Sequence, residues 1–158
     1  IDAREATDID VELDFVIASL HTALHQPREQ VTQRLLNAIN NPHVDMIAHP
    51  TGRLLPDRAG ADLDMDAVIS AAARTGTILE VNANPARLDL RDIHVHMAID
   101  SGVKIAINTD AHRAEDFELL HYGVATAQRG WATAADVVNT WSIERLLSYI
   151  AEKTIKQP

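Results

Sequence analysis

The residues best suited to chemistry in this chain are a carboxylate and an imidazole at the end of an apolar run. Asp110 and His112 directly follow the β-branched run 103–109, which predicts a buried strand. In extended backbone, residues two apart face the same side, so the two side chains could converge on one point. One hard oxygen and one imidazole nitrogen suit a divalent cation.

Two histidines give the same arrangement earlier in the chain. The apolar run 14–20 ends in His21, and the run 45–48 ends in His49. In parallel βα proteins the C-terminal ends of the strands form the active-site face, because helices cover the other surfaces. A single histidine at a strand end is more often packed or solvated, but three such strand ends favour a shared site.

Composition limits what this site can be made of. The chain has 158 residues, of which 46% are hydrophobic and 23% charged, which suits one globular core. It has no cysteine, which excludes disulfides, thiolate zinc sites and cysteine nucleophiles. Any metal must therefore be held by His, Asp and Glu.

Charge and hydropathy limit the kinds of partner that the chain can bind. No apolar stretch approaches the roughly 18 to 20 residues that a membrane-spanning helix needs, so we expect a cytoplasmic protein with no membrane partner. The net charge of −9 disfavours a broad nucleic-acid surface, because phosphate backbones require Lys and Arg clusters. It leaves open a narrow site where bound cations reverse the local field.

The elements that must position these residues alternate along the chain. We expect strands at about 13–20, 45–48, 77–82 and 103–108, and helices at about 28–40, 64–75, 89–101, 115–129 and 142–152, with a short helical piece near 134–139. Gly76 and Gly102 follow two of these helices. Such alternation predicts an α/β fold with a parallel sheet. The loop 50–63 is long enough to be functional.

Several short motifs carry a family resemblance. Ala18–His21, Ile47–Pro50, Leu79–Asn84 and Asn108–His112 together resemble the later motifs of the PHP (polymerase and histidinol phosphatase) domain. Pro85–Leu90, Gly130–Trp131 and Asp136–Thr140 look most similar to the PHP domain of bacterial family X DNA polymerases. The similarity runs over about residues 10–150. The ordered set is far more specific than any single motif.

The resemblance implies a fold and a domain organisation. It implies the C-terminal portion of a distorted (β/α)7 PHP barrel, with about four parallel strands and flanking helices. Residues 1–158 would form the C-terminal part of a single PHP domain, and the N-terminal part of the barrel would lie outside this chain. Four strands of a barrel would leave two exposed sheet edges, which the missing barrel half or another copy of the chain would cover.

The resemblance also implies a metal site. His21, His49 and Asp110 match metal ligands, and His112 matches a ligand of a third cation. The intact domain would hold up to three divalent ions, and Zn, Mn or Fe would suit these donors. The family's opening His-x-His motif and a bridging Glu would lie before Ile1, so we expect an incomplete cluster here. No residue nucleophile is required, because water activated by the cations attacks the phosphoester.

The expected function is therefore a metal-dependent phosphoesterase. In a family X polymerase the substrate would be DNA, through 3′-to-5′ exonuclease action or 3′-phosphate processing. A stand-alone relative would instead cleave a small phosphomonoester, as histidinol phosphatase does. The remaining alternative is a catalytically silent structural or interaction module.

Three further residues are candidates for substrate binding. Arg53 lies four positions after His49 and could bind a phosphate bidentately, or be solvated on its loop. Asn82 and Asn84 could orient a substrate, or end the strand by bonding their own backbone. Glu80, on the same strand, is better interpreted as a buried polar partner than as an outer-shell metal ligand.

One His-x-His pair is not a metal motif. His94 and His96 lie in a segment with helical apolar spacing, where residues two apart diverge by about 200°. We therefore expect two histidines on a helix surface. His25 and His43 are expected to be solvated, and His121 to lie on an amphipathic helix.

Overall fold

The computed structural model describes residues 13–156, with side chains up to residue 153. The elements are β1 (Ile17–Ser19), α1 (Arg28–Ile39), β2 (Met46–Ala48), α2 (Met65–Thr75), β3 (Ile78–Asn82), α3 (Asp92–Asp100), β4 (Ile105–Asn108), the 3-10 helix η1 (Ala114–Leu119), α4 (Leu120–Arg129), the 3-10 helix η2 (Val138–Thr140) and α5 (Ile143–Lys156). The predicted α/β alternation is confirmed.

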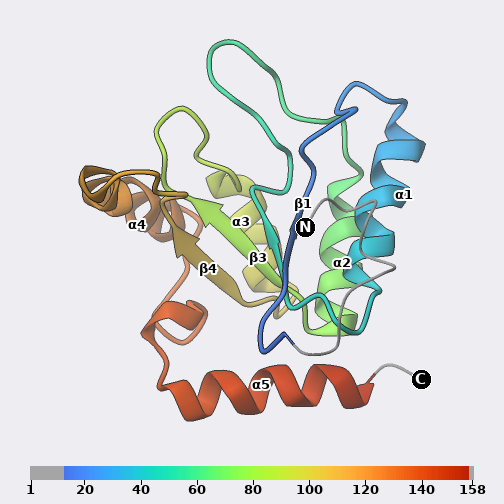
Figure 1. Ribbon diagram of the computed structural model, residues 1–158, viewed down its shortest axis with the longest axis vertical. Coiled ribbons are helices and arrows are strands. Elements are labelled where there is room, and N and C mark those ends of the chain that lie inside the picture. The colour runs from blue at the N-terminus through green and yellow to red at the C-terminus, as the bar shows by residue number, and fades with distance from the viewer. Residues whose placement is uncertain (1–12, 157–158) are drawn as a thin grey trace.

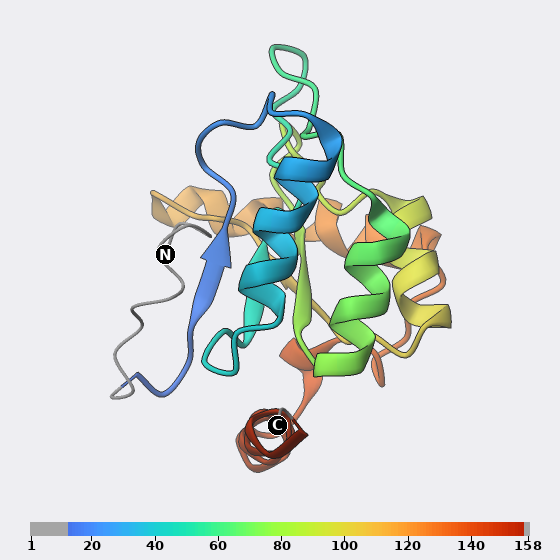
Figure 2. The ribbon, with the colours of Figure 1, turned by 90° about the vertical axis from the view of Figure 1, so that its right-hand side faces the viewer.

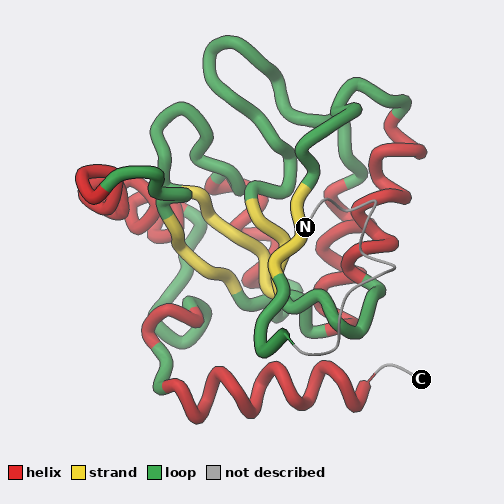
Figure 3. Tube along the Cα trace, viewed as in Figure 1, coloured by secondary structure: helices red, strands yellow, loops and turns green. Residues whose placement is uncertain are grey.

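The four strands, yellow in Figure 3, form one parallel sheet in the order β1-β2-β3-β4. The register places Ser19 beside Ala48, and Asn82 beside Asn108. Helices α1, α2 and α3 cover one face of the sheet, and α4 lies beside the C-terminal ends of β3 and β4 (Figures 1 and 2). Helix α5 crosses the opposite end of the strands (Figure 1). This arrangement is compatible with part of a (β/α) barrel.

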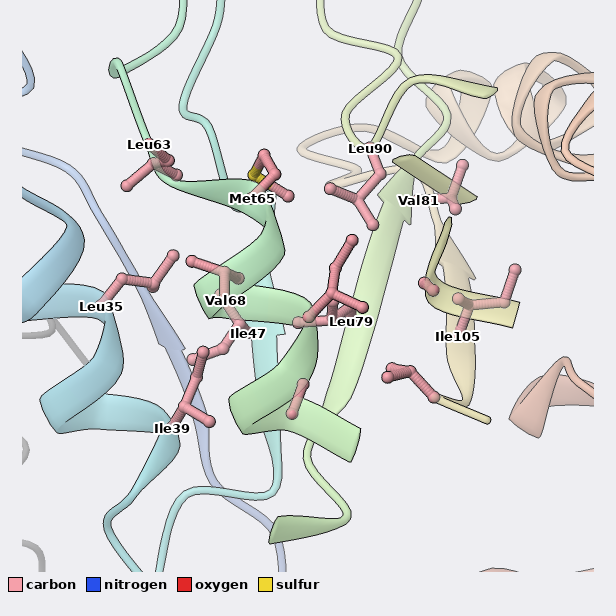
Figure 4. Packing of buried hydrophobic residues seen from close by; sticks show 14 of the residues in the cluster. Leu35, Ile39, Ile47, Leu63, Met65, Val68, Leu79, Val81, Leu90 and Ile105 are labelled. Atoms are coloured by element: carbon pink, nitrogen blue, oxygen red, sulfur yellow. The ribbon is translucent and has the colours of Figure 1, made fainter. Parts of the chain in front are cut away.

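The core lies between the sheet and α1 to α3. The spacing of four in α1 buries Leu35 and Ile39 completely, and Val68 of α2 meets Ile47 and Leu79 of the sheet (Figure 4). Each fully buried aliphatic side chain of this size stabilises the fold by about 1.5–3 kcal/mol. The opposite face of the sheet carries Met46 and Ala106, which belong to a second, smaller apolar cluster with α5 residues. Because both faces of the sheet are covered, the strand sequences are continuous hydrophobic runs rather than alternating ones.

Local signals fix the ends of α2. The Asp64 carboxylate accepts a hydrogen bond from Ala67 N–H at 3.2 Å, which caps the N-terminus. Gly76 ends the helix in the left-handed conformation at φ +76°, where glycine has no Cβ penalty. The predicted stop at Gly76 is confirmed.

Several element boundaries differ from the sequence prediction. The expected helix 115–129 is the 3-10 helix η1 as far as Leu119 and an α-helix only from Leu120, and the last helix ends at Lys156 rather than 152. The first strand covers Ile17–Ser19 rather than 13–20. Helix α3 begins at Asp92 rather than 89, because Asp89 and Leu90 are buried and extend beside β3. Asn82 N–H donates to Asp89 O at 2.6 Å, and Leu90 N–H donates to Glu80 O at 3.0 Å.

The expectation of two exposed sheet edges is wrong at β4. Segment 136–139 lies along its outer side, where Ile105 N–H donates to Asp136 O at 2.9 Å and Ile105 bridges Val137 in parallel. The same pairing explains why the predicted helical piece near 134–139 is reduced to the single 3-10 turn Val138–Thr140. At the other edge, no strand among residues 13–156 pairs with the free side of β1.

Helices in the described part of the chain are too short or too polar to cross a membrane.

Candidate metal centre

His21 and His49 lie side by side at the C-terminal ends of two neighbouring strands. Because β1 and β2 are paired in parallel with Ser19 beside Ala48, the residues that follow them emerge at the same edge of the sheet. Their ring centroids are 5.3 Å apart at an interplanar angle of 60°. His21 is exposed, and Ser19 Oγ lies 3.2 Å from its ring nitrogens. The sequence-predicted pair is thus brought into contact.

One ring nitrogen of His49 has no hydrogen-bond partner in the described part of the chain. This nitrogen is Nδ1, and the residue is only 4% exposed. Burial, and then the positive charge of Arg87, lower the pKa of His49 to about 4. The imidazole is therefore neutral at pH 7, and neutral imidazole is the form that ligates cations.

Asp110 follows β4 at the same end of the sheet. It has φ +54°, and His49 has φ +30°, so both residues occupy the left-handed region that non-glycine residues rarely adopt. Such backbone costs of order 1–3 kcal/mol and is concentrated at functional sites. The Asp110 carboxylate is exposed and its charge acts on His49, in the direction that raises the His49 pKa.

His112 does not join this group. The left-handed turn at Asp110 ends the extended backbone, so the expected same-side arrangement of Asp110 and His112 is not formed. Instead, His112 Nδ1 lies 2.7 Å from Asp110 O, and His112 N–H donates to Asp116 Oδ2 at 3.0 Å. The side chain is exposed beside the site, and its role as a ligand of a separate cation stays a prediction.

The ligand atoms at this edge are of the kinds that bind a divalent cation, but they are too few to form a complete metal site. Two imidazoles in contact, one with an unpartnered buried nitrogen, and a nearby carboxylate are the donors that Zn, Mn and Fe accept. Within residues 13–156, no three His, Asp or Glu side chains converge as a metal-binding group. A complete site would need further ligands.

Glu80 is a buried residue that hydrogen-bonds His49. It is 4% exposed, and its carboxylate accepts hydrogen bonds from His49 N–H at 2.7 Å and from Asn108 Nδ2 at 3.0 Å. Burial raises its pKa. The prediction of a buried polar partner is confirmed. A cavity of about 430 Å³ lies on the sheet face opposite α1 to α3, and its polar lining residues are Glu80, Asn108, Asp110 and Asn139.

Arg87 lies at the candidate site, although the sequence did not single it out. Its Nε lies 3.8 Å from Asp110 Oδ2, and its Nη1 donates to Arg53 O at 3.2 Å. Arg53, by contrast, points its guanidinium at the carbonyls of Arg87 and Leu88. Arg87 is therefore the arginine beside the candidate ligands, and the substrate contact of Arg53 stays a prediction. The only signal was its place in the 85–90 motif.

Asp89 was also missed, and it fixes the turn that follows His49. Its fully buried carboxylate accepts hydrogen bonds from Thr51 N–H and Thr51 Oγ1 at 3.0 Å each, and from Gly52 N–H at 2.9 Å. Burial raises its pKa to about 6, against the lowering effect of these hydrogen bonds.

Asn82 and Asn84 act on the local backbone. Asn82 Oδ1 accepts from Asn84 N–H at 3.1 Å, and Asn84 Oδ1 accepts from Ala86 N–H at 3.0 Å. These are the bonds with which asparagine ends a strand. That interpretation is confirmed, and a contact with substrate stays a prediction.

The remaining histidines lie on the expected elements, but His94 and His96 are half-buried rather than on the helix surface. His94 and His96 are on α3, and the His96 ring packs 4.5 Å from that of Trp131. His25 and His43 are exposed, and His121 lies on α4.

The geometry defines an α/β protein with imidazoles, a carboxylate and an arginine at the carboxyl ends of parallel strands. No protein-family profile matches the chain. It is 46% identical over 143 residues to the DNA polymerase/3'-5' exonuclease PolX of Bacillus subtilis (strain 168). That match covers 90% of this chain and 25% of the relative.

Probable phosphatases are similar over almost the whole chain. The protein of that name from Thermoanaerobacter sp. (strain X514) is 31% identical over 155 residues, covering 92% of this chain and 60% of the relative. One from Caldanaerobacter subterraneus subsp. tengcongensis is 32% identical over 151 residues, covering 90% and 57%. The chain thus spans about three fifths of these phosphatases and a quarter of the polymerase.

Proposed function

We propose that this chain is the C-terminal part of a PHP domain and contributes ligands to a metal-dependent phosphoester hydrolase centre. The observation that carries the proposal is the edge contact of His21 and His49, with the unpartnered Nδ1 of His49 beside the Asp110–Arg87 pair. Imidazole, carboxylate and guanidinium at one strand edge are the groups that hold a divalent cation and a phosphate.

His21, His49 and Asp110 would hold the cation, and His112 would serve a further one. A divalent cation bound there supplies Lewis-acid stabilisation of phosphoester oxygens and lowers the pKa of water. Arg87 binds the nonbridging phosphate oxygens and orients the ester, because its planar guanidinium can donate two parallel hydrogen bonds. Glu80 and Asp89 keep His49 in place through the backbone bonds described above.

The substrate that we propose is the 3′ end of DNA, cleaved by 3′-to-5′ exonuclease action or 3′-phosphate removal. The similarity to PolX, at 46% identity, supports this choice. The alternative is a small phosphomonoester, which the similarity to probable phosphatases favours. A labelled oligonucleotide and a histidinol phosphate assay on the same preparation separate the two.

Asp110→Asn tests the metal centre without disturbing its backbone, because asparagine tolerates positive φ. Bound Mn and Zn and phosphodiesterase activity are measured on the 158-residue chain and on a longer form that reaches the length of the phosphatase relatives. We expect the longer form to bind metal and to lose it on Asp110→Asn. Asp100→Asn, an exposed position on α3, should leave both readouts unchanged.

Three results would change the proposal. Unchanged metal content in Asp110→Asn would contradict the assignment of Asp110 as a ligand. A longer form that binds no metal and hydrolyses no phosphoester would favour the silent structural module. Metal-dependent hydrolysis by the 158-residue chain would contradict our expectation that its cluster is incomplete.

A further inference from the structure

A second cavity lies away from the candidate metal centre, between the loop 50–63 and the N-terminal end of α3. Its volume is about 460 Å³. Arg53, Arg91 and His94 line it, and so do the apolar side chains of Leu55, Leu63 and Met65. Figure 1 shows this loop rising above α2 and α3. None of the residues proposed as metal ligands lines the cavity.

The two arginines of this cavity act on each other and on His94. Burial, followed by the charges of Arg91 and Arg53, lowers the pKa of His94. Arg91 likewise lowers the pKa of Arg53, after burial, while Asp89 and Asp92 act in the opposite direction. Among the described residues, neither Arg53 nor Arg91 forms an ion pair. The chain as a whole has a net charge of −9, so the positive charge of these arginines is a local feature of the cavity.

The carboxylates nearby have other partners. Asp62 itself lines the cavity and pairs with Arg28 at 3.1 Å, and Asp92 pairs with Arg129 at 2.8 Å. The Asp89 carboxylate accepts backbone hydrogen bonds from the turn after His49, as described above. These pairings leave the two arginines of the cavity without a close counter-ion within residues 13–156.

One further feature favours an anion here. The cavity lies at the N-terminus of the nine-residue helix α3, where the helix dipole attracts negative charge. The wall is held in place, because the Arg53 guanidinium donates to the carbonyls of Arg87 and Leu88.

We propose that this cavity binds a nucleoside monophosphate, with the phosphate facing Arg53, Arg91 and His94 and the base against Leu55, Leu63 and Met65. Guanidinium groups bind phosphate bidentately, and the apolar side chains offer a surface to a flat ring. The volume falls within the range of about 300–1,000 Å³ for small-molecule sites. No residue to which the proposed function assigns a role lines this cavity, so the proposal does not rest on that function.

Titration of thymidine 5′-monophosphate, thymidine and inorganic phosphate, followed by calorimetry or amide chemical shifts, tests this proposal. We expect the monophosphate to bind more tightly than the other two. Arg91→Gln should weaken its binding about tenfold or more, since a hydrogen bond to a charged group is lost. Because Arg91 is exposed, this variant should unfold at the same temperature as the parent.

Two control variants locate the site. Arg74→Gln removes one positive charge at the C-terminal end of α2 and should leave the dissociation constant unchanged. Asp110→Asn alters the hydrolytic centre and should also leave it unchanged. Equal binding to the parent and to Arg91→Gln, binding abolished only by Asp110→Asn, or binding of thymidine or inorganic phosphate as tight as that of the monophosphate would each overturn the proposal.

Discussion

The side-chain amide of Asn139 hydrogen-bonds both backbone groups of Ile107. Ile107 N–H donates to Asn139 Oδ1 at 2.7 Å, and Asn139 Nδ2 donates to Ile107 O at 3.1 Å. A side chain thus takes the place that a neighbouring strand would have beside β4. Because Asp110 follows β4 by two residues, this contact holds the strand that presents the candidate carboxylate ligand.

Asn139→Ala should destabilise the fold by about 1–3 kcal/mol, because it leaves two backbone groups of Ile107 without partners. Urea denaturation gives the free energy of unfolding, and hydrogen exchange at the Ile107 amide should become faster. Asn37→Ala removes an exposed side-chain contact with Gln33 on α1 and should change stability by less than about 0.5 kcal/mol. Equal effects of the two substitutions would contradict the edge role of Asn139.

The sequence could predict the strand ends that carry His21 and His49, because the signals are local. Each strand is a short apolar run, and parallel pairing then brings the two histidines together. The start of α3 could not be predicted, since Asp89 resembles an acidic residue in a first helical turn. Its burial depends on Thr51 and Gly52, which lie 38 and 37 positions earlier.

The place of Arg87 could not be predicted for the same reason. It reaches Asp110, 23 positions later in the chain, only because the loop that follows β3 folds back over the end of β4. No periodic pattern encodes such a loop. The hydrogen bonds of Asn139 to the edge of β4 likewise join residues 32 positions apart in the chain. Asparagine is typical of turns, so its type did not predict this contact.

The pKa of Asp89 predicts a pH dependence of stability. Its pKa is about 6 in the fold and 3.8 in the reference state, so the folded chain binds the proton more tightly. The contribution of Asp89 to the free energy of unfolding is therefore fully present below about pH 4. It is lost as the pH rises through 6, and the free energy of unfolding falls by on the order of 3 kcal/mol. Denaturation of the parent and of Asp89→Asn between pH 4 and 7 measures it. A constant difference between the two across this range would contradict the prediction.

Lys153 is a buried cation whose removal should stabilise the protein. It is 2% exposed, and its Nζ has no hydrogen-bond partner among the described residues. Burial lowers its pKa to about 8, although Asp45 acts in the opposite direction. The folded state thus binds fewer protons than the unfolded state between pH 8 and 10.5, so stability should rise with pH across that window.

Lys153→Met should therefore raise the free energy of unfolding at pH 7 by about 1–3 kcal/mol. The gain should shrink at pH 10, when the parent lysine is largely neutral in the fold. Lys104→Met is the matched control, because Lys104 Nζ lies 3.3 Å from Asp136 and its loss should not stabilise the chain. A less stable Lys153→Met at pH 7 would show that the Asp45 interaction outweighs the cost of burial.

Gly123 allows α4 to pack closely on the strand ends. A Cβ at this position would lie 2.6 Å from Ile107 Cγ2 and 2.7 Å from Ala83 Cβ. Gly123→Ala should destabilise the fold by about 1–2 kcal/mol, because overpacking outweighs the gain of about 1 kcal/mol in helix propensity. Thermal unfolding measures the effect. Gln128→Ala, at an exposed position of the same helix, should change stability by less than about 0.5 kcal/mol, and a stabilising Gly123→Ala would contradict the close packing.

Glu80→Gln tests whether the support beneath His49 matters for metal binding. Glu80 accepts hydrogen bonds from His49 N–H and Asn108 Nδ2, and a glutamine would direct its own amide hydrogens at one of these donors. Outer-shell changes of this kind weaken metal affinity by about 10–100-fold. We expect that loss for Mn or Zn in the longer form of the chain, measured by competition with a chelator at a temperature where circular dichroism shows both proteins folded. Glu118→Gln, which is exposed on η1, should keep the parent affinity. Unchanged affinity in folded Glu80→Gln would mean that His49 holds its position without this carboxylate.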